Sequence, residues 1–252
     1  MKLTPEQKQE IADQQAQKNT TKRVTSKELE KILYEALPVL DHGFVRVVDY
    51  MGDDSSIVQS ARVSYGKGTK KVSTDEGLIK YLMRHWHSTP FEMCEIKYHV
   101  KLPIFIARQW IRHRTANVNE ISGRYSVLNP EFYIPDKIYD QGKLNKQMSG
   151  NEIKCDHTKQ LYTEYINNSY KQYNTYKMLI DRGVSKEMAR IGLPLNMYTE
   201  FYWCIDLHNL MNFIKLRSAI NAQHEIKEYS DAMKELISDL CPHTISSFNK
   251  YY

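Results

Sequence analysis

The segment between Arg112 and Ser126 concentrates side chains that bind anions. Its sequence, RHRTANVNEISGRYS, holds three arginines, a histidine, two asparagines, a glutamate, a glycine and two serines. Most basic residues elsewhere in the chain are lysines, which are typical of a solvated surface. Arginine is favoured over lysine where a planar guanidinium grips a phosphate or a carboxylate at two points. This composition therefore predicts a site for an anionic ligand.

The second half of this segment suits a phosphate group. Ser122, Gly123 and Arg124 offer a hydroxyl, backbone amides and a guanidinium at consecutive positions. Glu120 could accept a hydrogen bond from a base or a ribose. The alternative is a salt-bridged surface segment in which Glu120 only neutralises a nearby arginine, and the residues alone leave that alternative open.

A second polar cluster has the sequence HWHSTPFE and runs from His85 to Glu92. Two histidines with a following glutamate could suggest a metal, but their spacing does not match a helical zinc pair. We therefore predict no metal site. We expect instead a loop after a helix that offers polar contacts and a stacking ring to a ligand.

A third cluster, residues 207–217, has apolar side chains at helical spacing, a pattern that is typical of a core-facing helix. Asn212 and Arg217 interrupt this pattern and could face a site instead of the core. Arg190, which follows a predicted short helix, is ambiguous in the same way.

The cysteines show no metal-binding or disulfide spacing. None of the four forms a Cys-x-x-Cys pair, which predicts reduced thiols and a cytoplasmic location. They are Cys94, Cys155, Cys204 and Cys241. Cys241 lies two residues before a histidine, but this proximity in sequence does not guarantee the geometry of an activated nucleophile. A structural position at the start of the last helix, just before Pro242, is favoured.

Composition narrows the class of protein. The chain of 252 residues is 41% hydrophobic and 26% charged, which is ordinary for a globular protein. A formal net charge of +5 and a pI of 8.8 suit anionic ligands, but fall short of a dedicated nucleic-acid binder. No apolar run approaches the roughly 20 residues that span a membrane. The dinucleotide-binding, P-loop and nucleophile-elbow motifs are all absent from the sequence.

The pattern of elements predicts an α+β fold: a single domain with a mainly antiparallel sheet and several long helices. We expect residues 1–25 to form a polar, flexible N-terminal arm and residues 26–252 to form the domain. Strands are expected at 43–50, 94–102 and 197–205, with an extended segment at 132–139. Helices are expected at 26–37, 54–65, 151–182, 209–219 and 222–240. Three more are expected: one from a cap at 73–75 to residue 85, one that starts at residue 104, and a short one after Gly183 that ends near residue 192. A Gly/Lys-rich loop is expected at 66–71, and Gln109 and Arg112 should share a helical face.

The motif RHRxxNxNExSxRY at residues 112–125 closely resembles the signature of flavin-dependent thymidylate synthases, RHRxxSxNExSxRY. The departure is Asn117, where the family usually has serine. Further segments resemble the family in the expected order, and together they cover roughly residues 44–250. These segments are residues 87–92, 103–110, 189–194 and 210–217.

This resemblance implies the reductive methylation of dUMP to dTMP. Methylene-tetrahydrofolate would supply the carbon, and NADPH would supply hydride through FAD, which carries the difficult chemistry. No cysteine nucleophile would be needed. The resemblance also implies a homotetramer whose active sites are shared between subunits, with no nucleic-acid or membrane partner.

The resemblance assigns roles by position. Arg217 should lie against the pyrimidine and stabilise negative charge on its carbonyls, and His87 should lie near the flavin ring, so both are predicted catalytic residues. The predicted FAD contacts are Thr89, Glu92, Arg112, His113, Arg114, Thr115, Glu120, His208 and Asn212. The predicted dUMP contacts are Gln109, Glu120, Ser122, Gly123, Arg124, Arg190 and Arg217.

Four positions depart from residues that are frequent in the family: Met93, Asp206, His208 and Asn221. We expect these departures to weaken flavin binding. His208 could still meet a phosphate, but it would do so fully only when protonated. Two other hypotheses stay open: a nucleic-acid-binding module, suggested by the pI, the arginines and 18 tyrosines, and a family member that binds nucleotide without turnover.

Overall fold

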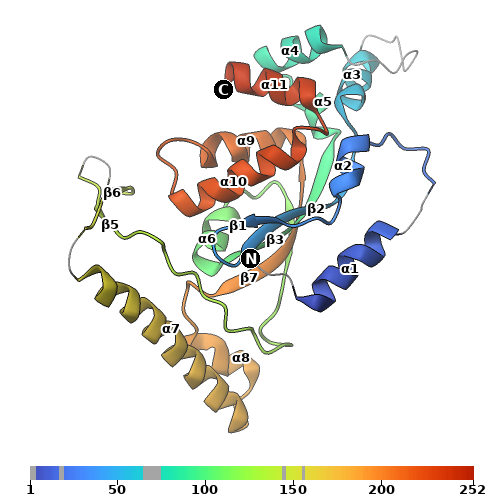
Figure 1. Ribbon diagram of the computed structural model, residues 1–252. Coiled ribbons are helices and arrows are strands. Elements are labelled where there is room, and N and C mark those ends of the chain that lie inside the picture. Colours follow the sequence, from blue (N-terminus) through green and yellow to red (C-terminus); the bar gives the residue numbers. More distant parts are fainter. Residues whose placement is uncertain (1–3, 17–19, 65–74, 144–145, 155–156) are drawn as a thin grey trace.

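A computed structural model describes residues 4–16, 20–64, 75–143, 146–154 and 157–252. Its centre is a five-stranded sheet in the order β1-β2-β3-β7-β4, in which every neighbouring pair is antiparallel (Figure 1). These strands are β1 (Leu37–Val39), β2 (Gly43–Met51), β3 (Glu95–Pro103), β7 (Tyr198–Asp206) and β4 (Asn117–Glu120). A separate hairpin pairs β5 (Tyr139–Gln141) with β6 (Ser149–Glu152). The predicted α+β architecture with a mainly antiparallel sheet is confirmed.

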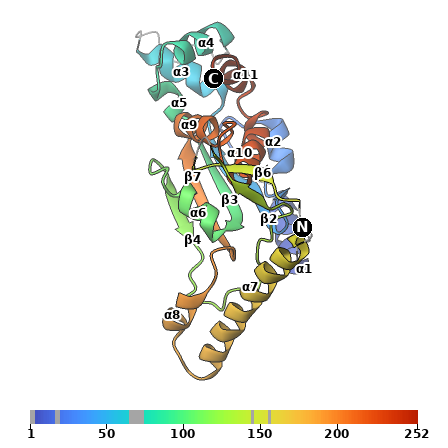
Figure 2. The ribbon, with the colours of Figure 1, turned by 90° about the vertical axis from the view of Figure 1, so that its left-hand side faces the viewer.

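The helices fall into three groups. Helices α6 (Ile104–Trp110), α9 (Leu207–Arg217) and α10 (His224–Ile237) cover one face of the sheet. Beyond one end of the sheet lie α2 (Lys27–Ile32), α3 (Asp54–Val63), α4 (Glu76–Arg84), α5 (Thr89–Glu92) and α11 (Pro242–Tyr251). At the opposite end lie α7 (Thr158–Asp181), α8 (Lys186–Ala189) and the 3₁₀ turn η1 (Arg190–Gly192), and α7 extends away from the sheet (Figure 2). No helix of the described residues is both long and apolar enough to cross a bilayer.

The core lies between the sheet and α6, α9 and α10. Alternate side chains of β3 point into it because successive strand residues face opposite sides. Trp110, at the end of α6, is fully buried, with ring centroids 5.3 Å from Trp203 of β7, 4.7 Å from Phe213 of α9 and 6.0 Å from Tyr229 of α10. These aromatic contacts hold α9 against β7, which is the strand that leads into it.

The other face of the sheet carries a polar network. His99 accepts a hydrogen bond from Arg46 at 3.0 Å through Nδ1, and its Nε2 lies 3.1 Å from Glu200. Burial raises the pKa of Glu200, but hydrogen bonding and charge from His99, with help from nearby cations, lower it overall. Helix α1 (Pro5–Ala16) contacts this face through Glu10, which pairs with Arg46 at 3.4 Å. The expected arm therefore contains a helix, while its boundary at residue 25 stays a prediction.

A buried carboxylate joins two of the terminal helices. Asp54, in the first turn of α3, is only 2% exposed and accepts hydrogen bonds from the backbone amides of His243 and Thr244 and from the Thr244 hydroxyl. These amides belong to the first turn of α11, where orphan donors and the helix dipole favour an anion. Cys241 is the N-cap of α11 and Pro242 its first residue, as predicted for the last helix.

Most predicted elements form close to the expected residues. The three strands appear as β2, β3 and β7, and a helix begins at Ile104, after Pro103. Asp75 caps α4 by accepting from the Leu78 amide at 3.1 Å. The expectations for Tyr65, the loop 66–71, the alternative caps Ser73 and Thr74, and Cys155 lie outside the described residues.

Two helix predictions are wrong in their bounds. Helix α2 ends at Ile32, because Leu33 leaves the helical conformation with a ψ of 136°. Leu37 begins strand β1, and Pro38 disfavours a helical conformation at that residue. The helix expected from Asn151 begins at Thr158, and residues 149–152 form β6. A β-carbon at Gly150 would clash with a carboxylate oxygen of Asp140, so a larger residue here would require the Asp140 side chain to move.

The shared helical face expected for Gln109 and Arg112 is also wrong. Helix α6 ends at Trp110, and Arg112 lies in the turn that follows. Three amides of this turn bond back to carbonyls of the last helical turn: Ile111 to Ala107 at 3.0 Å, Arg112 to Gln109 at 3.3 Å and His113 to Trp110 at 3.0 Å. The chain therefore leaves the helix before the arginine-rich segment begins.

Candidate active site

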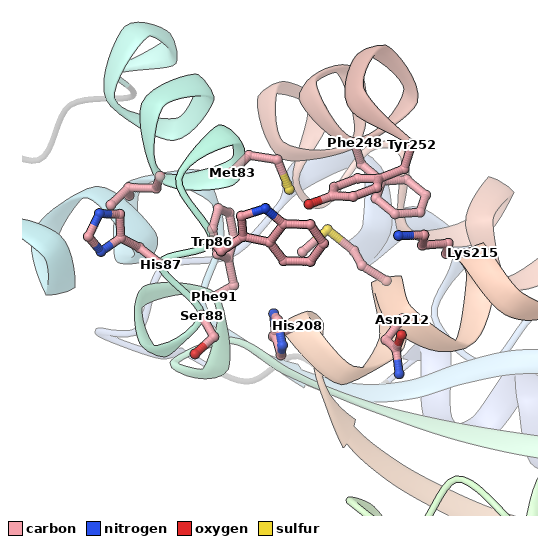
Figure 3. A pocket seen from close by; sticks show the side chains of 12 residues that line it. Met83, Trp86, His87, Ser88, Phe91, His208, Asn212, Lys215, Phe248 and Tyr252 are labelled. Atoms are coloured by element: carbon pink, nitrogen blue, oxygen red, sulfur yellow. The ribbon is translucent and has the colours of Figure 1, made fainter.

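A pocket with a cavity of about 150 Å³ opens between α4, α5, α9 and α11, and we call it the α9 pocket (Figure 3). Three predicted site residues line it: His87, His208 and Asn212. The remaining lining is mostly apolar or aromatic and consists of Leu82, Met83, Trp86, Ser88, Phe91, Met211, Lys215, Phe248 and Tyr252. An apolar pocket with a few polar groups is typical of a site for a flat, partly apolar ligand.

Trp86 occupies an unusual backbone position at the rim of this pocket. Its φ of 60° is left-handed, and it follows the last turn of α4 in a Schellman arrangement, with the His87 amide bonded to the Leu82 carbonyl at 3.0 Å. Glycine or asparagine usually fills this position, because a bulky side chain there is strained. The Trp86 ring is 69% exposed and lies edge-on to Tyr252, with the Lys215 ammonium 5.4 Å from its centroid.

His87 is turned away from the centre of the pocket. Figure 3 places its ring on the far side of Trp86 from Tyr252. The ring stacks on Tyr81 at a centroid distance of 5.8 Å, and the side chain is exposed. A ligand that reaches His87 would therefore approach from outside the cavity. Thr89 and Glu92, which are predicted FAD contacts, lie on α5, which packs against α9.

The last residue of α9, Arg217, contacts His113 of the turn before β4, and we call this contact the His113–Arg217 pair. Nε of Arg217 donates a hydrogen bond to Nε2 of His113 at 3.0 Å. Burial, with a further contribution from the charge of Arg217, lowers the pKa of His113 to about 4, and burial also lowers the pKa of Arg217. The His113 ring packs edge-on against Phe213 at 4.8 Å. Two segments of the chain, one from the signature motif and one from α9, thus meet at a predicted catalytic arginine.

Four predicted dUMP contacts gather at the start of β7, and we call them the Ser122–Arg190 group: Ser122, Gly123, Arg124 and Arg190. A β-carbon at Gly123 would lie 3.0 Å from Leu128 and 3.3 Å from Cδ of Arg190, so the absence of a side chain lets Arg190 approach. Arg124 contacts Glu187 of α8 at 3.5 Å, and its amide bonds to the Ser122 hydroxyl at 3.3 Å.

The remaining predicted residues lie between these places. Arg112, Arg114 and Thr115 are exposed in the turn before β4. Glu120, on β4, accepts a hydrogen bond from the Thr199 hydroxyl at 2.6 Å, and Gln109 contacts the side chain of Gln223. The contact of Glu120 is thus a hydrogen bond with a hydroxyl, and it is not the salt bridge to an arginine that the alternative interpretation of this residue required.

The departures from the family pattern have different surroundings. Asp206 is the N-cap of α9 and accepts from the Asn209 amide at 2.9 Å, so a carboxylate there stabilises the start of the helix. His208 lines the α9 pocket, whereas Met93 lines a different cavity together with residues 21–25. Asn221 is exposed beside the β5–β6 hairpin.

The described cysteines are poorly suited to act as nucleophiles. Cys94 and Cys241 are fully buried, and contact with Cys94 together with burial raises the pKa of the Cys241 thiol. Burial, followed by the charge of Glu95, raises the pKa of Cys204. Raised pKa values disfavour the reactive thiolate. Among the described residues, no three His, Cys, Asp or Glu side chains group as metal ligands would.

Sequence reasoning missed several residues of the α9 pocket. Phe248 on α11 and Tyr252 just after this helix line the pocket. The Lys215 ammonium lies 4.3 Å from the ring centroid of Tyr252 and also faces the Trp86 ring. The apolar spacing of α11 indicates only that one face is buried. Trp86 is an aromatic residue in the expected loop after α4, and its stacking on a ligand stays a prediction.

The α+β fold, the α9 pocket and the polar side chains at both ends of β7 are features of a ligand-binding protein. Comparison with known proteins agrees with this. The family described as "Thymidylate synthase complementing protein" matches residues 46–243. Relatives named "Flavin-dependent thymidylate synthase" include one from Wolbachia pipientis wMel, 58% identical over 92% of this chain and 82% of the relative. Another, from Ruegeria pomeroyi, is 52% identical over 100% of this chain and 85% of the relative.

The chain therefore belongs to the flavin-dependent thymidylate synthase family. Among solved structures, it is similar to the UMP/dUMP methylase PolB from Streptomyces cacaoi, crystallised with 5-Br dUMP. The two share 29% identity with a TM-score of 0.75, over 85% of this chain and 98% of PolB.

Proposed function

We propose that the protein methylates dUMP to dTMP, with methylene-tetrahydrofolate as carbon donor and NADPH as the source of hydride. Because a hydride reduces the transferred carbon to a methyl group, the carrier would leave as tetrahydrofolate. The observation that carries this proposal is the His113–Arg217 pair in a chain of this family. In this pair, His113 of the signature motif holds the guanidinium of Arg217. The dUMP analogue bound to PolB supports the choice of nucleotide.

The side chains that are available fit a flavin dinucleotide. FAD, when bound, would accept hydride from NADPH and pass it on. Arg112 and Arg114 are exposed cations without a carboxylate partner among the described residues, which suits its pyrophosphate. The α9 pocket would take an aromatic portion, with Asn212 and His208 as polar contacts and Thr89 and Glu92 beside it. Thr115 and Glu120 complete the proposed set.

Arg217 would stabilise negative charge that develops on the pyrimidine carbonyls. Its Nη groups have no partner among the described residues, so both can donate to a ligand. A fixed donor that faces developing charge lowers the barrier because it needs little rearrangement during the reaction. His87, exposed at the pocket rim, would help to position the folate.

The Ser122–Arg190 group would bind the nucleotide phosphate. The hydroxyl of Ser122, the close packing at Gly123 and the guanidinium groups of Arg124 and Arg190 make a donor-rich surface. Gln109 and Glu120 would contact the rest of dUMP. The raised pKa values of the buried Cys241 thiol and of Cys204 support a reaction without a cysteine nucleophile.

We further propose that each active site is shared between copies of the chain, as in a homotetramer. The Ser122–Arg190 group lies at the start of β7, and α9 begins at the other end of this strand. A strand of nine residues spans about 27 Å. Figure 2 places α8 below β4 and α9 above it. Helix α7 buries only Ser169 and Tyr176, and its exposed apolar side chains offer a surface for another copy. No nucleic-acid or membrane partner is proposed, and the cytoplasmic location stays a prediction.

Spectroscopy with substrates tests the function directly. Purified protein with added FAD should show a bound flavin spectrum that bleaches with NADPH under anaerobic conditions in the presence of dUMP. Addition of methylene-tetrahydrofolate should restore the oxidised spectrum and yield dTMP. A protein that retains no flavin would contradict the proposal, and one that binds dUMP without forming dTMP would be a nucleotide-binding family member without turnover.

A further inference from the structure

We propose that His113 positions the guanidinium of Arg217, and that it does so as a neutral ring with its proton on Nδ1. The role in catalysis rests on the proposed function, whereas the protonation state of the ring does not. His113, a residue of the signature motif, thus contacts Arg217 of the same chain.

The direction of the hydrogen bond fixes the proton on the ring. An arginine guanidinium stays protonated and only donates, so Nε of Arg217 must be the donor to Nε2 of His113 across 3.0 Å. Nε2 must then keep its lone pair. A neutral histidine has one protonated nitrogen, which leaves Nδ1 as its place. An imidazolium is incompatible with this contact because both of its nitrogens are donors.

The surroundings of His113 keep it neutral. The ring is partly buried and packs edge-on against Phe213, which lies one helical turn before Arg217 on α9. Burial and the cationic partner both disfavour a positive charge on the ring, in agreement with its low pKa. The acceptor is therefore present at neutral pH.

The contact determines how Arg217 presents itself to a ligand. Arginine has a long, flexible side chain, but a hydrogen bond at Nε fixes the plane of its fork. Nη1 and Nη2 have no partner among the described residues and lie in that plane. A pre-oriented fork can donate two parallel hydrogen bonds, which suits a carbonyl or carboxylate face better than a freely rotating side chain does.

This role differs from the flavin contact that the family resemblance assigns to His113. The acceptor nitrogen is occupied by Arg217, so only the Nδ1–H donor is left for another group. Loss of the acceptor should therefore change the chemistry at Arg217 more than it changes flavin retention.

Nitrogen NMR of protein labelled with ¹⁵N-histidine tests the protonation state without any substrate. The His113 signal, assigned by its loss in H113Q, should show an unprotonated Nε2 and a protonated Nδ1 between pH 6 and 8. In R217K, which lacks the Nε donor, this preference should weaken. A proton on Nε2, or an imidazolium at pH 6, would overturn the proposal even if the enzyme makes dTMP as proposed.

Kinetics with matched variants test the positioning. H113F keeps a ring against Phe213 but has no acceptor, whereas H113Q offers an amide oxygen. We expect H113F to lower kcat about 10–100-fold, as loss of a charge-assisted hydrogen bond would, with flavin content retained and a smaller effect on the KM for dUMP. H113Q should recover most of that loss. In the R217K background H113F should have little further effect, since coupled residues are not additive.

The outcomes separate the two proposals. If H113F and H113Q are equally impaired, or if H113F loses flavin in proportion to activity, His113 does not act through Arg217 and the positioning role fails. If the wild-type protein forms no dTMP, the proposed function fails, and the NMR result still decides whether the ring accepts from Arg217.

Discussion

The two ends of β7 differ in how far a single chain organises its polar side chains. Beyond the end of β7 that leads into α9, Arg217 at the far end of this helix is partly buried and held by His113 at 3.0 Å. At the other end of β7, the side chains of Arg124 and Glu187 are 54% and 59% exposed and meet only at 3.5 Å. Contacts within the chain therefore define the orientation of Arg217, whereas Arg124 is left to be ordered by a ligand or by another copy.

We expect the largest loss of activity from a substitution of Arg217. Replacement by alanine should lower kcat for dTMP formation by about 10²–10³-fold, the cost of removing one pre-oriented donor. The fold should persist, because the side chain lies at the end of α9 and outside the main core cluster. Steady-state kinetics and thermal unfolding measure both effects, with R23A in the exposed segment before α2 as control. Full activity in R217A would remove the proposed role.

Complementation between inactive chains tests whether the two ends belong to one site. Chains with R217A and chains with R190A should each be impaired, but mixed oligomers should regain activity if each site takes Arg217 from one copy and Arg190 from another. Co-expression with two affinity tags, followed by assay of the doubly selected species, measures this. No gain over either parent would mean that both arginines act within the same chain.

The smallest effect concerns pH and stability. His113 has a pKa of about 4 when folded, below the ordinary value of a free histidine, so the folded protein binds fewer protons than the unfolded chain between those values. The free energy of unfolding should therefore fall as the pH drops from about 6.5 towards 4. Denaturant titrations of wild type and H113Q should show a weaker fall in the variant. An identical dependence would mean that His113 titrates normally in the folded state.

Much of the scaffold could be predicted from local patterns. Alternation in β3 and the proline before α6 each fix an element by short-range physics. The anion-binding character expected of residues 112–126 stays a prediction. Strand β4 was missed because its four residues, NVNE, are all exposed and three of them are polar, so only its pairing with β7 reveals it.

Other features depend on contacts between distant segments. The hydrogen bond between His113 and Arg217 joins residues 104 positions apart, and the sequence gives no sign of it. Phe248 and Tyr252 line the α9 pocket from a helix whose start is bonded to Asp54, about 190 positions earlier in the chain. Asp206 looked like a weakened flavin contact, yet it caps α9, a role that any helix start can assign to a carboxylate.

The position of Trp86 also gives the protein an internal optical probe. Of the three tryptophans, Trp110 and Trp203 are 0% and 2% exposed, whereas Trp86 is 69% exposed at the rim of the α9 pocket. Fluorescence excited at long wavelength, and its quenching by iodide, would therefore report mainly on Trp86. A ligand that enters the pocket should shield this one indole and change its emission, so occupancy can be followed in solution without modifying the chain.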